Sequence, residues 1–264
     1  MKQYIIDCFT DKVFSGNQAA VCIADKMPPD SLMRDIAREN NFSETAFAVR
    51  QGSVYRLRWF TPGGEIDLCG HATLGTAFVL FNFYHKDMQE ISFETLSGRL
   101  TVRRSGDGEL CLMDFPAYEY TPTDVTDEME RAFGTRPREA YIARDLMAVF
   151  DSEDIIGNMK PDFEAAARLP GMGAAVTALG RDYDCVSRFF APKVHIPEDP
   201  VTGSAHCMIA PYWGQRLGKD TVAAFQASER TGTLYCTLSG DRVIIGGRAV
   251  LFAVSDILPE QKFL

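Results

Sequence analysis

The sequence predicts an α+β fold of two pseudo-symmetric lobes, each a curved mixed or antiparallel sheet wrapped around a central helix. Two observations carry this prediction. Short strand-like runs outnumber helical ones. In addition, two segments, RWFTPGGEIDLCGHATLG (58–75) and RFFAPKVHIPEDPVTGSAHC (188–207), share one order of features. In each, an aromatic–x–Pro turn follows a strand, and an acid stands five positions before a glycine that begins a small-residue helix.

The first half contains two expected helices among its strands. Ser31 to Glu39 follows Pro-Pro-Asp and is expected to be a helix with Asp30 as its N-cap. The run from Ala72 to Phe83 is apolar on nearly every side, which is typical of a helix buried all round. The expected strands are Tyr4 to Phe9, Ala19 to Ile23, Thr45 to Val49, Tyr55 to Phe60, Ile91 to Glu94, Arg99 to Arg103 and Glu109 to Asp114.

The second half repeats the same order. Ala148-Val149-Phe150 corresponds to the strand at residues 20–23, and Pro161-Asp162 corresponds to Pro29-Asp30. A length of 264 residues suits two domains of about 130 residues each. Periodicity is lost between residues 114 and 124, so we expect lobes at 1–117 and 118–264. A return of the C-terminal tail to the first lobe is left open.

Composition limits the function. With 46% hydrophobic and 24% charged residues, the chain is an ordinary globular protein. A net charge of −9 without a basic stripe argues against a nucleic-acid partner. We expect no membrane association and a cytoplasmic location, because neither a long apolar run nor a signal peptide is evident. The seven cysteines form no C-x-x-C pair, which argues against a disulfide framework or structural zinc.

The two repeated glycines suggest an anion site. Helices that begin at Gly70 and Gly203 offer backbone N–H groups without an intrahelical partner, and their dipoles favour negative charge. A substrate carboxylate could be held there without an arginine. The alternative is that both glycines only cap their helices, but their equivalent places in the two copies favour function.

Polar side chains stand beside these glycines. The helix dipole would disfavour the protonated form of His71, leaving a neutral imidazole suited to proton relay or hydrogen bonding. The dipole could also favour a thiolate at Cys69. Asp199 lies in a rigid turn, and Ser204 follows Gly203. The structural alternatives are a core histidine, a turn aspartate and a capping serine.

Glu44 is a second acidic candidate. It begins an apolar strand, whereas the corresponding part of the second copy, near residues 173–175, carries no acid. One acid in a symmetric scaffold suggests a single catalytic base. Apolar walls would raise the pKa of Glu44 towards neutrality, as a group that acts as base and then acid requires. A surface glutamate is the alternative.

These segments resemble the PhzF-like isomerases of phenazine biosynthesis over nearly the whole chain. The resemblance rests on Asn-Phe-Ser-Glu-Thr-Ala-Phe (41–47), on Phe-Thr-Pro followed by Glu-x-Asp-Leu-Cys-Gly-His-Ala-Thr-Leu-Gly (60–75), and on Pro-Glu-Asp-Pro-Val-Thr-Gly-Ser-Ala (197–205). Residues 7–10 and 14–20 match as well. The resemblance implies a diaminopimelate-epimerase-like fold and a homodimer.

The resemblance also implies roles. Glu44 would take a proton from one substrate carbon and return it to another, and His71 and Asp199 would be the other catalytic residues. Gly70, Gly203 and Ser204 would bind the carboxylate of a small substrate. No metal, flavin or pyridoxal phosphate is implied.

Two other functions stay open. Related epimerases and racemases use two opposed cysteines, and here Cys69 stands at the first helix start but Thr202 at the second. The other alternative is a small-acid-binding protein without turnover. The physiological substrate is not predicted.

Overall fold

The computed structural model describes residues 1–258. The chain divides into two compact units. Unit 1 contains Met1–Asp114 and the segment that begins at Gly247, and unit 2 is Phe115–Gly246. The C-terminal strand therefore belongs to unit 1, and each unit is described by itself below.

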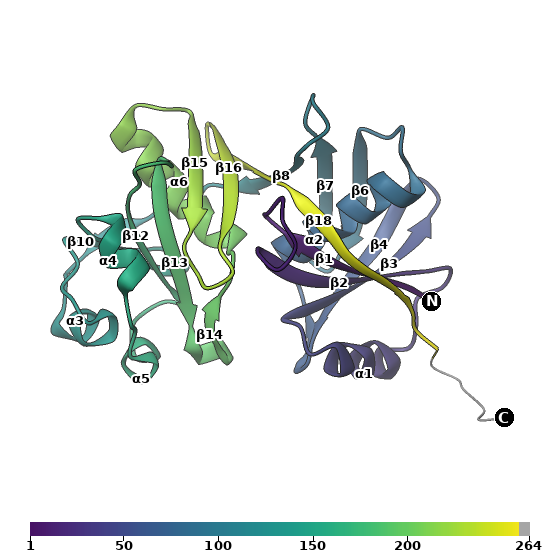
Figure 1. Cartoon of the computed structure of the whole chain (residues 1–264), viewed down its shortest axis with the longest axis horizontal. Coiled ribbons are helices and arrows are strands. Elements are labelled where there is room, and N and C mark those ends of the chain that lie inside the picture. Colours follow the sequence, from purple (N-terminus) through teal and green to yellow (C-terminus); the bar gives the residue numbers. More distant parts are fainter. Residues whose placement is uncertain (259–264) are drawn as a thin grey trace. The chain divides into compact units, whose positions relative to one another are not determined.

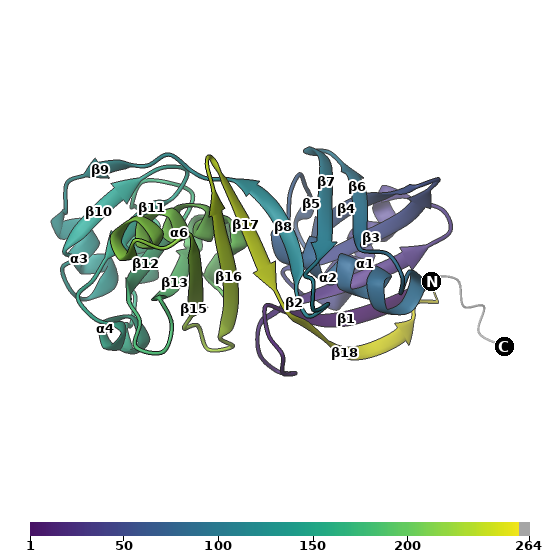
Figure 2. The ribbon, with the colours of Figure 1, turned by 90° about the horizontal axis from the view of Figure 1, so that it is seen from above.

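Unit 1 is a mixed sheet around one buried helix. The helix α2 (Gly70–Val79) contacts β1, β2, β3 and β18, and it continues as a π-helix, Leu80–Tyr84 (Figure 1, Figure 2). Helix α1 (Asp30–Asn40) contacts β3 and β4. The strands are β1 (Lys2–Cys8), β2 (Asn17–Ala24), β3 (Glu44–Gln51), β4 (Val54–Thr61), β5 (Gly64–Ile66), β6 (Glu90–Thr95), β7 (Gly98–Arg104), β8 (Cys111–Pro116) and β18 (Ala249–Asp256).

Unit 2 repeats this plan around α6 (Gly203–Leu217), which contacts β12, β15 and β16. Its other helices are α3 (Asp127–Phe133), α4 (Glu153–Asn158), α5 (Phe163–Ala166) and the 3-10 turn Pro192–Val194. The strands are β9 (Thr121–Thr123), β10 (Glu139–Ile142), β11 (Leu146–Val149), β12 (Ala174–Leu179), β13 (Cys185–Ala191), β14 (Ile196–Asp199), β15 (Thr221–Gln226), β16 (Gly232–Ser239) and β17 (Arg242–Gly247).

Strand pairing confirms the repeat. In unit 1, β2 is parallel to β3, β3 is antiparallel to β4, and β4 is antiparallel to β5 and parallel to β6. In unit 2, β11, β12, β13, β14 and β15 repeat this series in the same order and directions. Thr45 pairs with Phe60, and Ala174 pairs with Phe190. The register therefore makes Gly173 the counterpart of Glu44.

An arginine–glutamate pair is duplicated at side-chain level. Arg58 donates two hydrogen bonds of 2.6 Å to Glu65, and Arg188 donates two of 2.7 and 2.8 Å to Glu198. Each guanidinium also lies over the ring of the phenylalanine two positions later, at 5.2 and 5.0 Å. Bidentate pairs of this kind fix both distance and angle. The acid five positions before each glycine therefore anchors the turn that leads into the helix.

The expected helices need small corrections. Asp30 is not the N-cap of α1, because Pro29 occupies that position without a side-chain cap. The Asp30 carboxylate instead accepts a hydrogen bond from Arg58 at 2.8 Å. The buried helix begins at Gly70, the start expected from the anion-site argument, and the end of its apolar run is wound as a π-helix. Among residues 1–258, none of the helices is long and apolar enough to cross a membrane.

Candidate active site

Strand alternation places Glu44 on the α2 side of β3. Phe47 packs with Met33 and Ile36 of α1 in one apolar cluster. Successive strand residues point to opposite faces, so Glu44 faces away from this cluster. Asn40 supports the strand start, since its side-chain amide donates to Thr45 Oγ1 at 3.0 Å. The Glu44 side chain is therefore enclosed, with a residue exposure of 8%, and the surface-glutamate alternative is wrong.

His71 meets Glu44 inside unit 1. His71 is the second residue of α2 and is also buried. Its Nε2 lies 3.1 Å from Glu44 Oε2, while its Nδ1 lies 3.6 Å from Cys69 Sγ. The Nε2–Oε2 distance is that of an ion pair, but neither atom has a partner in hydrogen-bond geometry among the described residues. The pair is close, enclosed and only partly saturated with hydrogen bonds.

The charges of this pair differ from the sequence expectation. Burial is the largest single influence on the pKa of Glu44 and raises it, but the positive charge of His71 and the polar contacts of the carboxylate with His71, Ser43 and Cys69 together lower it by more, so the net shift is downward. Burial lowers the pKa of His71, but Cys69 and Glu44 raise it by more. The expected raised pKa for Glu44 and neutral imidazole for His71 are therefore wrong. Each group holds the other in its charged form, which neither the apolar walls nor the helix dipole overcomes.

Cys69 is a buried thiol at the N-cap of α2. Burial, followed by the negative charge of Glu44, raises its pKa. The expected dipole-favoured thiolate is therefore also wrong. The N-cap makes no side-chain cap hydrogen bond, and the first backbone bond of the helix runs from Thr73 N to Cys69 O at 3.2 Å. The N–H groups of Gly70 and His71 precede that bond, so they have no intrahelical acceptor.

The start of α6 brings together the candidates of unit 2. Gly203 and Ser204 are the first two residues of this helix, and Thr202 is its N-cap. Asp199 accepts a hydrogen bond from Thr202 Oγ1 at 2.5 Å. Gln226 fixes the turn, since its amide donates to Asp199 O at 2.7 Å and its carbonyl accepts from Thr202 N at 2.8 Å. Asp199 and Ser204 remain partly exposed.

Gly173 explains why unit 2 has no second glutamate. A Cβ at this position would lie 2.4 Å from the ring of Phe189 and 3.1 Å from the backbone oxygen of Phe190. Any side chain would have to displace that ring, so a counterpart of Glu44 does not fit the present packing. The asymmetry expected from the sequence therefore has a steric cause.

Asp145 is a buried acid that the sequence reasoning missed. It is 1% exposed, and its Oδ1 accepts a hydrogen bond from Gly173 N at 3.0 Å. Burial raises its pKa, and its Oδ2 has no hydrogen-bond partner among residues 1–258. Its position directly before the apolar strand β11 was the available signal. The Gly173 contact gives it a structural role in holding the start of β12.

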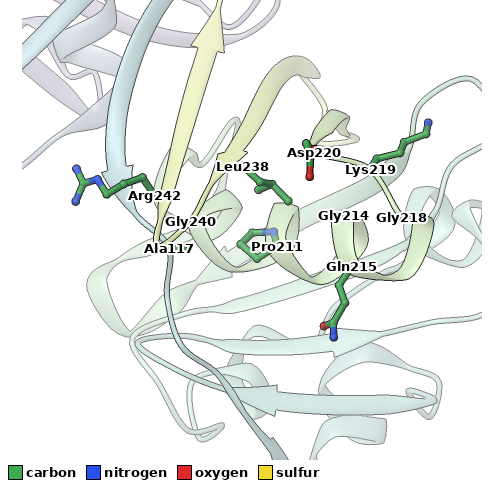
Figure 3. A pocket seen from close by; sticks show the side chains of 10 residues that line it. All are labelled: Ala117, Pro211, Gly214, Gln215, Gly218, Lys219, Asp220, Leu238, Gly240 and Arg242. Carbon is green, nitrogen blue, oxygen red and sulfur yellow. The ribbon is translucent and has the colours of Figure 1, made fainter.

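A hollow of about 340 Å³ in unit 2 lies beside α6. Pro211, Gly214 and Leu238 line it, and Lys219 and Arg242 extend away from each other at its two ends (Figure 3). Lys219 forms an ion pair with Asp184. None of the six candidate residues borders this hollow, and its two cations do not converge. We therefore do not assign the candidate chemistry to it.

Comparison with known proteins agrees with this architecture. The family model described as PhzC-PhzF, phenazine biosynthesis-like protein, matches residues 6–255. The chain belongs to this family. A PhzF-family crystal structure from Enterococcus faecalis has a TM-score of 0.95 and 48% identity, and the match covers 97% of this chain and 98% of that one. The diaminopimelate-epimerase-like α+β fold is therefore confirmed.

The curated relatives of this PhzF-family chain include proteins named as isomerases. An uncharacterized isomerase of Pseudomonas aeruginosa is 48% identical over 94% of this chain and 95% of its own length. A phenazine biosynthesis-like domain-containing protein of Rattus norvegicus is 40% identical over 94% and 96%. A probable proline racemase of Agrobacterium radiobacter has a TM-score of 0.62 at 13% identity, which shows shared fold alone. These names support an isomerase in the general sense.

Proposed function

We propose that this PhzF-family protein is an isomerase without an organic cofactor or resident metal, in which Glu44 moves a proton between carbons of a small carboxylate-bearing substrate. The observation that carries the proposal is the buried Glu44–His71 pair, 3.1 Å apart, at the start of α2. A carboxylate kept ionised inside a protein is available as a base. Nearby helix N–H groups favour an anionic substrate.

The proton balance of the reaction is simple. The Glu44 carboxylate takes a proton from a substrate C–H, and the electron pair of that bond spreads into the conjugated system of the substrate. Glu44 is then a neutral acid and returns the same proton to a second carbon. The charge of His71 stays beside the site throughout, which stabilises the substrate anion in an enclosed, low-dielectric setting.

Substrate binding is assigned to the helix starts. Gly70 N–H would donate to the substrate carboxylate, because it precedes the first intrahelical bond and no side chain caps it. Gly203 and Ser204 are assigned to binding, and Asp199 to catalysis, on the family resemblance. The Thr202 and Gln226 contacts that hold the Asp199 turn support this assignment.

The test is exchange of solvent deuterium. Candidate small carboxylic acids that raise the thermal midpoint would be incubated with the protein in D₂O and followed by proton NMR. We expect deuterium at carbon in at least one bound compound, together with movement of a double bond. Binding without exchange would instead support a protein that binds small acids without turnover.

Replacing Cys69 tests the two-base racemase alternative. We expect Cys69→Ala to keep exchange within a few-fold of the parent rate, because the thiol is buried and protonated and Thr202 stands at its counterpart position. Cys111→Ala is the matched control, since it removes another buried thiol of unit 1. A loss in Cys69→Ala as large as that caused by removing Glu44 would contradict the single-base proposal.

The charged pair also predicts the pH dependence. The pKa of Glu44 lies below the ordinary glutamate value of 4.5. Glu44 therefore stays ionised, and able to act as a base, until the pH falls below its own lowered pKa. Because the pKa of His71 is raised, its charge persists above 6.5 and is lost at higher pH. We expect kcat/KM to form a broad plateau whose two limbs belong to the pair. An acid limb near neutral pH would contradict the assignment.

A further inference from the structure

Glu44, His71 and Cys69 form a compact set of metal donors. A carboxylate oxygen, a ring nitrogen and the thiol sulfur of these residues all lie within 4.8 Å of one another, and all three residues are buried. A carboxylate, an imidazole and a thiol together are typical ligands of Zn²⁺. The cysteine spacing in the sequence argued against a structural zinc site, but it does not bear on a mixed set of donors of this kind.

The spacing of two of these donors suits one ion. Zn–N bonds of about 2.0 Å and Zn–S bonds of about 2.3 Å at a tetrahedral angle place nitrogen and sulfur about 3.5 Å apart. His71 Nδ1 and Cys69 Sγ are 3.6 Å apart. The sulfur and the nitrogen are therefore already separated by nearly the distance of two ligands in a tetrahedral site. Neither side chain would need to move far to bind an ion.

The carboxylate completes the arrangement. An imidazole binds an ion through one nitrogen, so His71 would use Nδ1, which faces Cys69, and the Glu44 carboxylate would leave its position 3.1 Å from Nε2 to join them. Glu44 Oε2 is a buried polar atom without a partner in hydrogen-bond geometry among residues 1–258. A buried polar atom left in this state favours a ligand that uses it. With Glu44 the site has three protein ligands. Open zinc sites also have three protein ligands and leave the fourth position for water or another molecule.

We propose that Zn²⁺ or a similar borderline-soft divalent ion binds Cys69, His71 and Glu44, and that it inhibits the protein. Binding releases the thiol proton of Cys69 and the ring proton of His71 to solvent, and it couples the Glu44 carboxylate to the metal. The base is then unable to accept a substrate proton. The ion is an inhibitor here and not a cofactor. Binding stands on the geometry alone, whereas inhibition rests on the proposed function.

Cobalt provides a readout that is independent of activity. Co²⁺ bound to a thiolate gives a charge-transfer absorption band in the near ultraviolet, so the parent protein titrated with Co²⁺ should develop this band, and Zn²⁺ should remove it. Cys69→Ser should lack the band, while Cys111→Ser, which removes a buried thiol elsewhere in unit 1, should retain it. Serine is a preferred N-cap residue, so Cys69→Ser should fold, as its thermal midpoint would show.

Inhibition is measured on the same variants. We expect Zn²⁺ to block deuterium exchange by the parent and by Cys111→Ser, and we expect Cys69→Ser to need about tenfold or more Zn²⁺ for equal inhibition. A cobalt band without exchange by any variant would defeat the proposed function but leave the metal site standing. Exchange without a cobalt band, or a band that persists in folded Cys69→Ser, would overturn the metal site.

Discussion

Replacing Glu44 with glutamine is expected to lower proton exchange about 10²- to 10⁴-fold, the usual contribution of a positioned general base. Glutamine has nearly the same shape but does not accept the substrate proton. The buried pair also loses its negative member, so the pKa of His71 should fall, although the contact with Cys69 remains. The variant should still bind the substrate, because the helix N–H groups are unchanged.

The measurement combines deuterium exchange with ligand-induced thermal shift. Glu90→Gln is the matched control, since this glutamate is exposed and pairs with the exposed Arg103. It should exchange at the parent rate. If folded Glu44→Gln kept exchange near that rate, another residue would be the base. Asp199 would then be the first candidate, because it is partly exposed at the start of α6.

Local patterns were sufficient to predict the repeated fold. The aromatic–x–Pro turn, the acid and the glycine each have a local cause, and their recurrence at 58–75 and 188–207 indicated a duplication that strand pairing confirms. The all-round apolar run after Gly70 predicted the buried central helix in the same way. Local propensity and tertiary packing agree at these places, so the sequence was informative.

The charges in the candidate site could not be predicted in this way. Glu44 and His71 are 27 positions apart in the chain, and their contact depends on strand parity in β3 and on the rotation of α2. Without that contact, burial and the helix dipole were the only visible effects, and both gave the wrong direction. The arginine partners of Glu65 and Glu198 were also not predicted. Each arginine lies on the preceding strand, and its contact with the glutamate depends on how the two strands pair.

The duplicated arginine–glutamate pair gives the largest expected effect on stability. Arg188 is mostly buried, and besides Glu198 it donates to the carbonyls of Ile156 and Met159 at 3.2 and 2.7 Å. Arg188→Met would leave the largely buried Glu198 carboxylate and both carbonyls without this donor. Breaking one partner of a buried pair typically costs about 3–5 kcal/mol. We therefore expect a loss of this order in the free energy of unfolding, measured by urea denaturation.

Three comparisons test this prediction further. Arg181→Met removes the ion pairs of an exposed arginine with Glu153 and Asp154 and should cost less than about 1 kcal/mol. Arg188→Met combined with Glu198→Gln should recover part of the loss, because the unpaired buried charge is gone. Arg58→Met should cost less than Arg188→Met, since Arg58 bonds two carboxylates, one of them exposed, and within residues 1–258 its guanidinium donates to no backbone carbonyl as Arg188 does. Equal losses at Arg58 and Arg188 would show that the glutamate pair alone carries the stability, whereas the expected order would assign the difference to the α4 carbonyls that Arg188 satisfies in unit 2.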